Sequence, residues 1–311
     1  MTVTTWLLLI VAIAIVAVLL TPWIAERLRI PMDVEEARVN APGEFAELQS
    51  GVTHYRWFGP EEGPLIVCVH GLSTPSFGYE GLATGLAIKG WRVLTYDLYG
   101  RGYSDNTPDA QTADFFLKQL DELLEDQGIT DKFSIVGYSM GGMIVTAFAA
   151  RSPERIERIM LLSTGGVAPI DLDSGSLIKP NKYPRLAHWA GMVFGGQQLR
   201  KYILDEDGAD PVRERQLMAT RRRGYWPALL SCRSNIIGED FATMHRKIAE
   251  SNLPVLAIWA EQDQVIPISA VGILAQLNRG ARQEVIKDAN HGLTYSHPAR
   301  IALFFDTWVK G

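Results

Sequence analysis

The chain has 311 residues, of which 47% are hydrophobic and 21% are charged, and this length allows one large domain or a core domain with an insertion. The net charge of −5 gives no electrostatic reason to expect nucleic-acid binding. The two cysteines, Cys68 and Cys232, lie far apart in the sequence and are interpreted as unpaired small hydrophobic residues, which leaves the redox compartment undecided.

The N-terminal stretch is the most hydrophobic part of the chain. Every residue from Trp6 to Leu20 is apolar, and the first charged residue is Glu26. About 20 uncharged residues are enough for a helix that spans a bilayer, so we predict a transmembrane anchor over residues 1–25. The alternative is the signal peptide of a secreted or periplasmic protein. Against it, residues 1–5 contain no Lys or Arg, and no clear small-x-small cleavage site precedes Glu26.

The charges beside this stretch indicate an orientation. Arginines follow the predicted span at positions 27, 29 and 38, and none precedes it. The positive-inside rule then predicts a single-pass membrane protein with the bulk of the chain in the cytoplasm. Residues 26–44 are predicted to form a linker, or a helix near the membrane surface.

Strands alternate with helices from residue 45 onward. Two extended runs are separated by Ser50-Gly51, which indicates a hairpin. Further apolar runs have the composition of buried parallel strands, and the segments between them have helical spacing. The strands are expected at 45–49, 52–58, 65–70, 91–96, 133–136 and 156–163, and the helices at 79–89, 112–127 and 143–150. This alternation predicts an α/β fold, with a mostly parallel sheet covered on both faces by helices.

The alternation stops after Thr164. Residues 165–250 show no strand pattern and contain Gly, Pro and Asp breaks between helix-like pieces. Strand and helix patterns resume at 254–259, 269–278, 283–287 and 298–310. We therefore predict a core made of residues 45–164 and 251–311, with residues 165–250 inserted as a helical cap.

A candidate nucleophile lies between a predicted strand and the helix at 143–150. Residues 137–141, Gly-Tyr-Ser-Met-Gly, fit the G-x-S-x-G pattern of a nucleophile elbow. So tight a turn leaves no room for Cβ atoms beside the serine, which explains the two glycines. It also presents the Ser139 hydroxyl at a helix N-terminus, where free N–H groups favour negative charge.

Four motifs occur in the order found in the α/β-hydrolase fold family, and the chain resembles that family over residues 45–310. They are His70-Gly71 after a strand, Asp97-x-x-Gly-x-Gly-x-Ser104, the Gly137–Gly142 elbow, and a late pair, Asp263 and His291. The serine in the elbow excludes relatives that use an aspartate nucleophile. The resemblance implies a serine hydrolase that forms an acyl-enzyme and requires neither a cofactor nor a metal.

The resemblance also implies the partners of Ser139. A serine hydroxyl needs a base to take its proton, and the family order of nucleophile, acid and histidine points to His291, which follows the strand at 283–287. Glu261 and Asp263 both follow the strand at 254–259. The family pattern favours Asp263 as the acid, four residues before Pro267. The oxyanion hole is expected to use the backbone N–H groups of Met140 and Leu72.

The predicted cap suggests the substrate. It is rich in apolar and aromatic residues, which mostly pack the cap but can also line an apolar pocket. Within it, Arg221-Arg-Arg223 is interpreted as a solvated helix face or, less readily, as a contact for anionic lipid headgroups. The order of anchor, core and cap resembles monoacylglycerol lipases and membrane-anchored α/β-hydrolase domain esterases, which implies a lipid-like ester substrate. The alternatives are a carbon–carbon bond hydrolase and a non-catalytic binding protein with the same fold.

Overall fold

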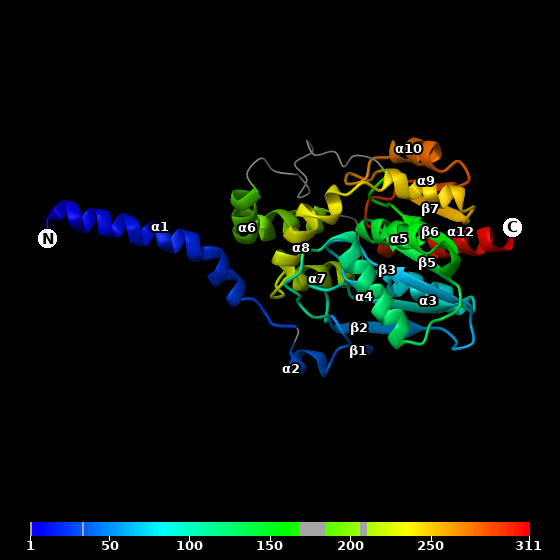
Figure 1. Ribbon diagram of the computed structural model, residues 1–311, viewed down its shortest axis with the longest axis horizontal. Helices are drawn as coiled ribbons and strands as arrows, with labels where there is room; N and C mark the ends of the chain where they lie inside the picture. The colour runs from blue at the N-terminus through cyan, green and yellow to red at the C-terminus, as the bar shows by residue number, and fades with distance from the viewer. Residues whose placement is uncertain (1, 33, 168–183, 206–209) are drawn as a thin grey trace.

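The computed structural model describes residues 2–32, 34–167, 184–205 and 210–311. An eight-stranded sheet forms its centre (Figure 1), with the strand order β1-β2-β4-β3-β5-β6-β7-β8. Strands β1 and β2 form an antiparallel hairpin, β2 pairs antiparallel with β4, and all other pairs are parallel. The strands are β1 (Glu44–Leu48), β2 (Gly51–Phe58), β3 (Leu65–Val69), β4 (Arg92–Tyr96), β5 (Phe133–Tyr138), β6 (Ile156–Leu162), β7 (Val255–Ala260) and β8 (Arg282–Ile286). The predicted α/β class and mostly parallel sheet are confirmed.

Helices cover both faces of the sheet, because successive residues of each buried strand point to opposite sides. Val67 and Val69 of β3 contribute to one apolar core, whereas Ile66 and Cys68 contribute to the other. The first face is covered by α4 (Ala113–Asp126), α5 (Met140–Arg151), α9 (Ala242–Glu250) and α10 (Ala270–Leu277); the second is covered by α3 (Glu80–Ile88), α11 (Leu293–Ser296) and α12 (Pro298–Lys310).

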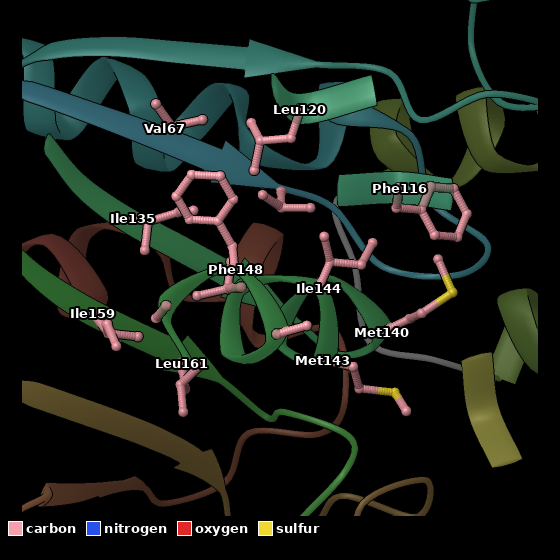
Figure 2. Close-up of a cluster of buried hydrophobic side chains, with 14 of the residues drawn as sticks. Val67, Phe116, Leu120, Ile135, Met140, Met143, Ile144, Phe148, Ile159 and Leu161 are labelled. Carbon is pink, nitrogen blue, oxygen red and sulfur yellow. The ribbon is translucent and has the colours of Figure 1, made fainter. Parts of the chain in front are cut away.

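Helix α5 carries the candidate nucleophile at its N-terminus and is buried along almost its whole length. Every residue from Met140 to Ala149 is buried, which fits a helix that is apolar on all sides. Figure 2 shows Ile144 and Phe148 of α5 among side chains of the sheet and of α4. This packing holds the first turn of α5 rigidly at the carboxyl edge of the sheet.

The described residues between β6 and β7 are mainly helical and contain no strand. They form α6 (Pro184–Asp205), α7 (Asp210–Ala219) and α8 (Tyr225–Ser234), followed by α9. The apolar side chains of α6 and α8 form a cluster of their own, which includes Met192, Trp226 and Leu229. In contrast, Ile248 of α9 packs in the core beside α5. Residues 168–183 and 206–209 of the predicted cap lie outside the described residues, and the cap boundaries remain a prediction.

Helix α1 (Val3–Arg27) extends away from the rest of the molecule (Figure 1). Within the part of the chain that the structure describes, it is the one helix long and apolar enough to cross a membrane, and none of its residues is buried. Its length, composition and position near the N-terminus suit either a membrane span or a signal sequence.

The segment after α1 is fastened to the body of the protein. Ile30 forms a parallel bridge with Arg222: its N–H donates to the carbonyl of Arg221 at 3.0 Å, and its carbonyl accepts from the N–H of Arg223 at 2.7 Å. Further along, Arg38 is the last residue of the short helix α2 (Glu35–Arg38), and its guanidinium donates to Asp105 Oδ1 at 2.7 Å. The predicted linker is therefore in contact with the folded domain at several places along its length.

The same contacts revise the interpretation of the basic cluster at 221–223. These residues form a turn between α7 and α8, and Arg222 is buried, with its guanidinium donating to the carbonyl of Ser104. The expectation of a solvated helix face is therefore wrong for Arg222. A run of three arginines usually indicates a solvated surface. Here the middle arginine, Arg222, is covered by the carbonyl of Ser104 and by the segment that follows α1, called the exit segment (residues 28–32).

Candidate active site

The candidate nucleophile, Ser139, lies in the sharp turn between β5 and α5. Its φ and ψ are 53° and −118°, an unusual conformation for a residue with a side chain. The two glycines allow the turn to pack: a Cβ on Gly141 would lie 2.0 Å from the carbonyl oxygen of Val69, and one on Gly137 would lie 2.6 Å from the carbonyl oxygen of Gly141. The spacing in the sequence thus has the expected steric basis.

The structure brings the three predicted catalytic side chains together. Ser139 Oγ lies 3.0 Å from Nε2 of His291, and Nδ1 of His291 lies 2.8 Å from Oδ2 of Asp263. These residues are 152 and 28 positions apart in the sequence, and they meet because β5, β7 and β8 are parallel and end at the same edge of the sheet. Glu261, the other acidic residue after β7, is exposed.

The acidic residue is held in its ionised form. Burial acts to raise the pKa of Asp263, but the nearby His291 and two backbone N–H groups outweigh it and lower the pKa below the ordinary value. Those N–H groups belong to Val265 and Ile266, each 2.8 Å from Oδ1. An ionised carboxylate accepts a hydrogen bond from Nδ1 of the imidazole, and in that tautomer Nε2 is unprotonated and can accept the serine proton.

Tyr138, the residue before the candidate nucleophile, contacts His291 through its hydroxyl and its ring. Its hydroxyl donates to the carbonyl of His291 at 2.9 Å, and the two rings lie 5.2 Å apart between centroids. The sequence offered no signal for this contact, because position 138 is one of the two variable positions of the G-x-S-x-G pattern.

The loop after β3, residues 71–75, passes directly beside the candidate nucleophile. A Cβ on Gly71 would lie 3.2 Å from Cβ of Ser139. His70 donates from Nδ1 to the carbonyl of Gly71 at 2.7 Å and accepts the N–H of Leu98 at Nε2, and burial lowers its pKa to about 4. Because a trans peptide directs its carbonyl and its N–H in opposite directions, the contact with Gly71 also orients the N–H of Leu72. Leu72 and Met140 remain the predicted oxyanion donors.

A second buried His–Asp pair lies outside this site and was not foreseen from the sequence. Nδ1 of His54 is 2.7 Å from Oδ2 of Asp97, and Nε2 is 2.5 Å from the carbonyl oxygen of Pro42. Both partners are pure acceptors, so the ring must carry a proton on each nitrogen to satisfy them. Burial acts to lower the pKa of His54, but Asp97 and Pro42 outweigh it and raise the pKa.

This pair predicts a pH-dependent contribution to stability. Because the pKa of His54 is higher in the folded chain, its contribution is complete below the unfolded value of about 6.5 and disappears as the pH rises through the folded pKa. We expect His54→Gln to lower the free energy of unfolding by about 3 kcal/mol at pH 6, because it leaves Asp97 buried without its partner. Urea denaturation between pH 6 and 9 measures this difference.

The wild-type and His54→Gln curves should converge toward alkaline pH. The half-buried His297 provides a matched control, since His297→Gln should shift stability by less than about 0.5 kcal/mol at every pH. A difference that stays constant up to pH 9 would show that the protonated state of His54 does not contribute as described.

Comparisons with known proteins agree with this fold. The model of the alpha/beta hydrolase fold family matches residues 64–193. Lipase 3 of Moraxella sp. is 23% identical over 234 residues, which cover 74% of this chain and 72% of the lipase. The 2-hydroxymuconate semialdehyde hydrolase of Pseudomonas putida is 26% identical over 258 residues, with 80% and 88% covered.

A solved structure is similar over most of the chain. The esterase of Exiguobacterium antarcticum superposes with a TM-score of 0.74 at 16% identity, over 86% of this chain and 100% of that one. Among the described residues, no group of three or more His, Cys, Asp or Glu side chains is arranged to hold a metal ion. With the sheet order and the family match in agreement, this chain has the α/β-hydrolase fold and is similar in sequence to that family over residues 64–193.

Proposed function

We propose that the protein is a serine hydrolase that cleaves carboxylic esters through an acyl-enzyme. The observation that carries this proposal is the continuous set of hydrogen bonds from Asp263 through His291 to Ser139. Nucleophile, base and orienting acid then have the geometry that acyl transfer requires.

The proposed reaction begins with attack of Ser139 Oγ on the ester carbonyl carbon. His291 Nε2 takes the serine proton, and the ionised Asp263 stabilises the imidazolium that forms. The carbonyl oxygen becomes an oxyanion that accepts hydrogen bonds from the N–H groups of Leu72 and Met140. His291 then donates its proton to the departing alcohol, and a water molecule, activated by the same imidazole, hydrolyses the acyl-enzyme and releases Ser139.

The proposed substrates are lipid-like esters such as monoacylglycerols. Two features support this choice: the apolar cluster of the α6–α8 segment, and the exposed apolar helix α1, which would keep the enzyme at a membrane. The resemblance of the chain to a protein named as a lipase points in the same direction.

A chain-length series of p-nitrophenyl esters, from acetate to dodecanoate, tests the substrate class. We expect the highest kcat/KM for medium chains, and labelling of the wild-type protein by a fluorophosphonate probe. A preference for acetate would count against lipid-like substrates. A folded protein that the probe does not label would overturn the serine hydrolase assignment and favour the non-catalytic alternative.

A second candidate is carbon–carbon bond hydrolysis, which the match to the hydrolase of P. putida favours. That enzyme class uses the same fold, so the triad geometry does not separate the two reactions. Turnover of 2-hydroxymuconate semialdehyde at a higher kcat/KM than any p-nitrophenyl ester would select this candidate. We favour ester cleavage because α1 has no evident use in an enzyme that degrades soluble aromatic products.

We further propose that α1 is a retained single-pass anchor and that the catalytic domain is cytoplasmic. The hydrogen bonds of the exit segment support retention, as does the indole of Trp189, which donates to the carbonyl of Val18 at 3.2 Å. We expect the full-length protein in the membrane fraction, released by detergent but not by 1 M salt. Deletion of residues 1–25 should give a soluble enzyme with kcat for short esters within about 3-fold, because Glu26 to Ile30 remain. Recovery of the full-length protein in the soluble fraction would refute the anchor.

A further inference from the structure

The loop of residues 71–75, which carries the predicted oxyanion donor Leu72, is held by side chains from distant parts of the chain. They come from the turn after β4 and from helices α7 and α8. They contact three consecutive residues of the loop, namely Leu72, Ser73 and Thr74. Loops at the surface of a fold rarely have this many buried partners.

Arg101 provides the first contact. Its side chain is fully buried, and Nε donates to the carbonyl of Leu72 at 3.1 Å. The other guanidinium nitrogens donate to the Tyr99 carbonyl at 3.0 Å, to Gln111 Oε1 at 2.5 Å and to Cys232 Sγ on α8 at 3.2 Å. Within the described residues, all these acceptors are uncharged. The guanidinium therefore joins the loop to α8. Its positive charge lies beside the peptide group between Leu72 and Ser73.

Tyr225 and Gln216 provide the other two contacts. Tyr225, the first residue of α8, is fully buried and donates from its hydroxyl to the carbonyl of Ser73 at 3.1 Å. Gln216 of α7 is also buried, and its Nε2 donates to Thr74 Oγ1 at 2.9 Å and to the hydroxyl of Tyr295 at 3.2 Å. Helices α7 and α8 therefore each bind the loop through a side-chain hydrogen bond.

We propose that Arg101 and Tyr225 are positioning residues, which fix the carbonyl groups of Leu72 and Ser73 so that the N–H of Leu72 faces the developing oxyanion. The inference rests on the proposed function. An oxyanion donor is effective only when it lies about 2.7–3.1 Å from the oxygen, so a small rotation of this loop weakens it. The carbonyl of Gly71 is already held by His70, and the two new contacts fix the next two peptides along the loop.

Both contacts connect the loop of residues 71–75 to helix α8. Tyr225 begins α8, and Cys232 lies further along the same helix and contacts Arg101. Movement of α8 would therefore shift both the Ser73 contact and the guanidinium that holds Leu72. In this way the position of α8 would affect how well the N–H of Leu72 stabilises the transition state.

Two substitutions test the proposal. Tyr225→Phe removes one hydroxyl and keeps the packing; Arg101→Lys keeps the charge and loses the planar set of donors. Complete loss of an oxyanion donor costs about 10²–10³ in kcat, so we expect partial displacement to lower kcat about 10-fold in Tyr225→Phe and about 30-fold in Arg101→Lys, with KM within about 2-fold. The measured reaction is hydrolysis of p-nitrophenyl butyrate.

Two further readouts separate positioning from general loss of structure. The inhibition constant of an alkyl trifluoromethyl ketone, whose adduct places an oxyanion in the same hole, should rise by the same factor as kcat falls. Hydrogen exchange in a peptide covering residues 70–79 should accelerate. Tyr55→Phe is the matched control, because this hydroxyl also has a protein acceptor, Glu44 Oε2 at 3.0 Å, but lies in the β1–β2 hairpin. It should leave kcat and the inhibition constant within about 2-fold at a comparable change in Tm.

The outcomes distinguish this inference from the proposed function. If the wild-type enzyme is active and both variants keep kcat and the inhibition constant, the positioning role is wrong and the serine hydrolase assignment stands. Equal losses in Tyr225→Phe and Tyr55→Phe would also overturn it. If the wild-type protein neither reacts with a fluorophosphonate nor cleaves esters, the proposed function fails, and the positioning role fails with it.

Discussion

Ser139→Ala is expected to abolish fluorophosphonate labelling and to lower kcat for p-nitrophenyl esters by about 10⁶-fold. The alanine lacks the oxygen that is proposed to form the acyl-enzyme, so the residual rate would come from binding and the predicted oxyanion hole. His291→Ala should lower kcat to a similar extent, because the members of a triad act as a unit. Both variants can be measured with the same ester and the same probe.

Ser134→Ala provides the control, since Ser134 is a buried serine on β5, the strand that leads into Ser139. It should be labelled normally and keep kcat within about 2-fold. Labelling that persists in a folded Ser139→Ala protein would identify a different nucleophile, and the proposed mechanism would then have to be abandoned.

Asp263→Asn is expected to lower kcat by about 10⁴-fold while the protein remains folded. An amide in this position keeps the shape of the carboxylate, but it no longer holds a proton on Nδ1 of His291 or stabilises the imidazolium. Because the pKa of Asp263 is lowered in the folded protein, its carboxylate should stay ionised, and the wild-type rate should not fall through titration of this group until the pH drops below the usual range of aspartate.

The exposed Glu261 gives a close comparison, because it follows the same strand and lies only two residues from Asp263. Glu261→Gln should keep kcat within about 2-fold. If the two substitutions had equal effects, Asp263 would not be the orienting acid, despite its distance of 2.8 Å from the imidazole.

The parts of the fold that depend on local pattern could be predicted from the sequence. The hairpin, the buried strands and the amphipathic helix α4 have the periodicity of their elements, and the structure places α4 at Ala113–Asp126 against an expected 112–127. The proximity of Ser139 to His291 followed from family order, and it has a simple physical basis. Parallel strands end at one edge, so residues that follow different strands meet there.

Other contacts could not be predicted because they join a side chain to a backbone atom far away in the sequence. Buried Arg222 donates to the carbonyl of Ser104, and the carbonyl of Pro42 adds to the effect of Asp97 in raising the pKa of His54. Every residue has a carbonyl group, so these acceptors leave no mark in the amino-acid pattern. The docking of the segment after α1 is hidden for the same reason, since each of its hydrogen bonds to residues 192–224 has a backbone group as at least one partner.

If α1 is the membrane anchor proposed above, the bridge between Ile30 and Arg222 determines how the proposed enzyme would meet a lipid substrate. If residues 28–44 were a flexible linker without contacts, its ends would be about 20 Å apart on average. The catalytic domain could then rotate freely above the lipid surface. Fastened three residues after α1, the domain would instead turn together with the helix and present one side to the leaflet at all times. Lipid molecules diffusing within that leaflet would then encounter the same face of the enzyme in a two-dimensional search, without having to leave the membrane for water.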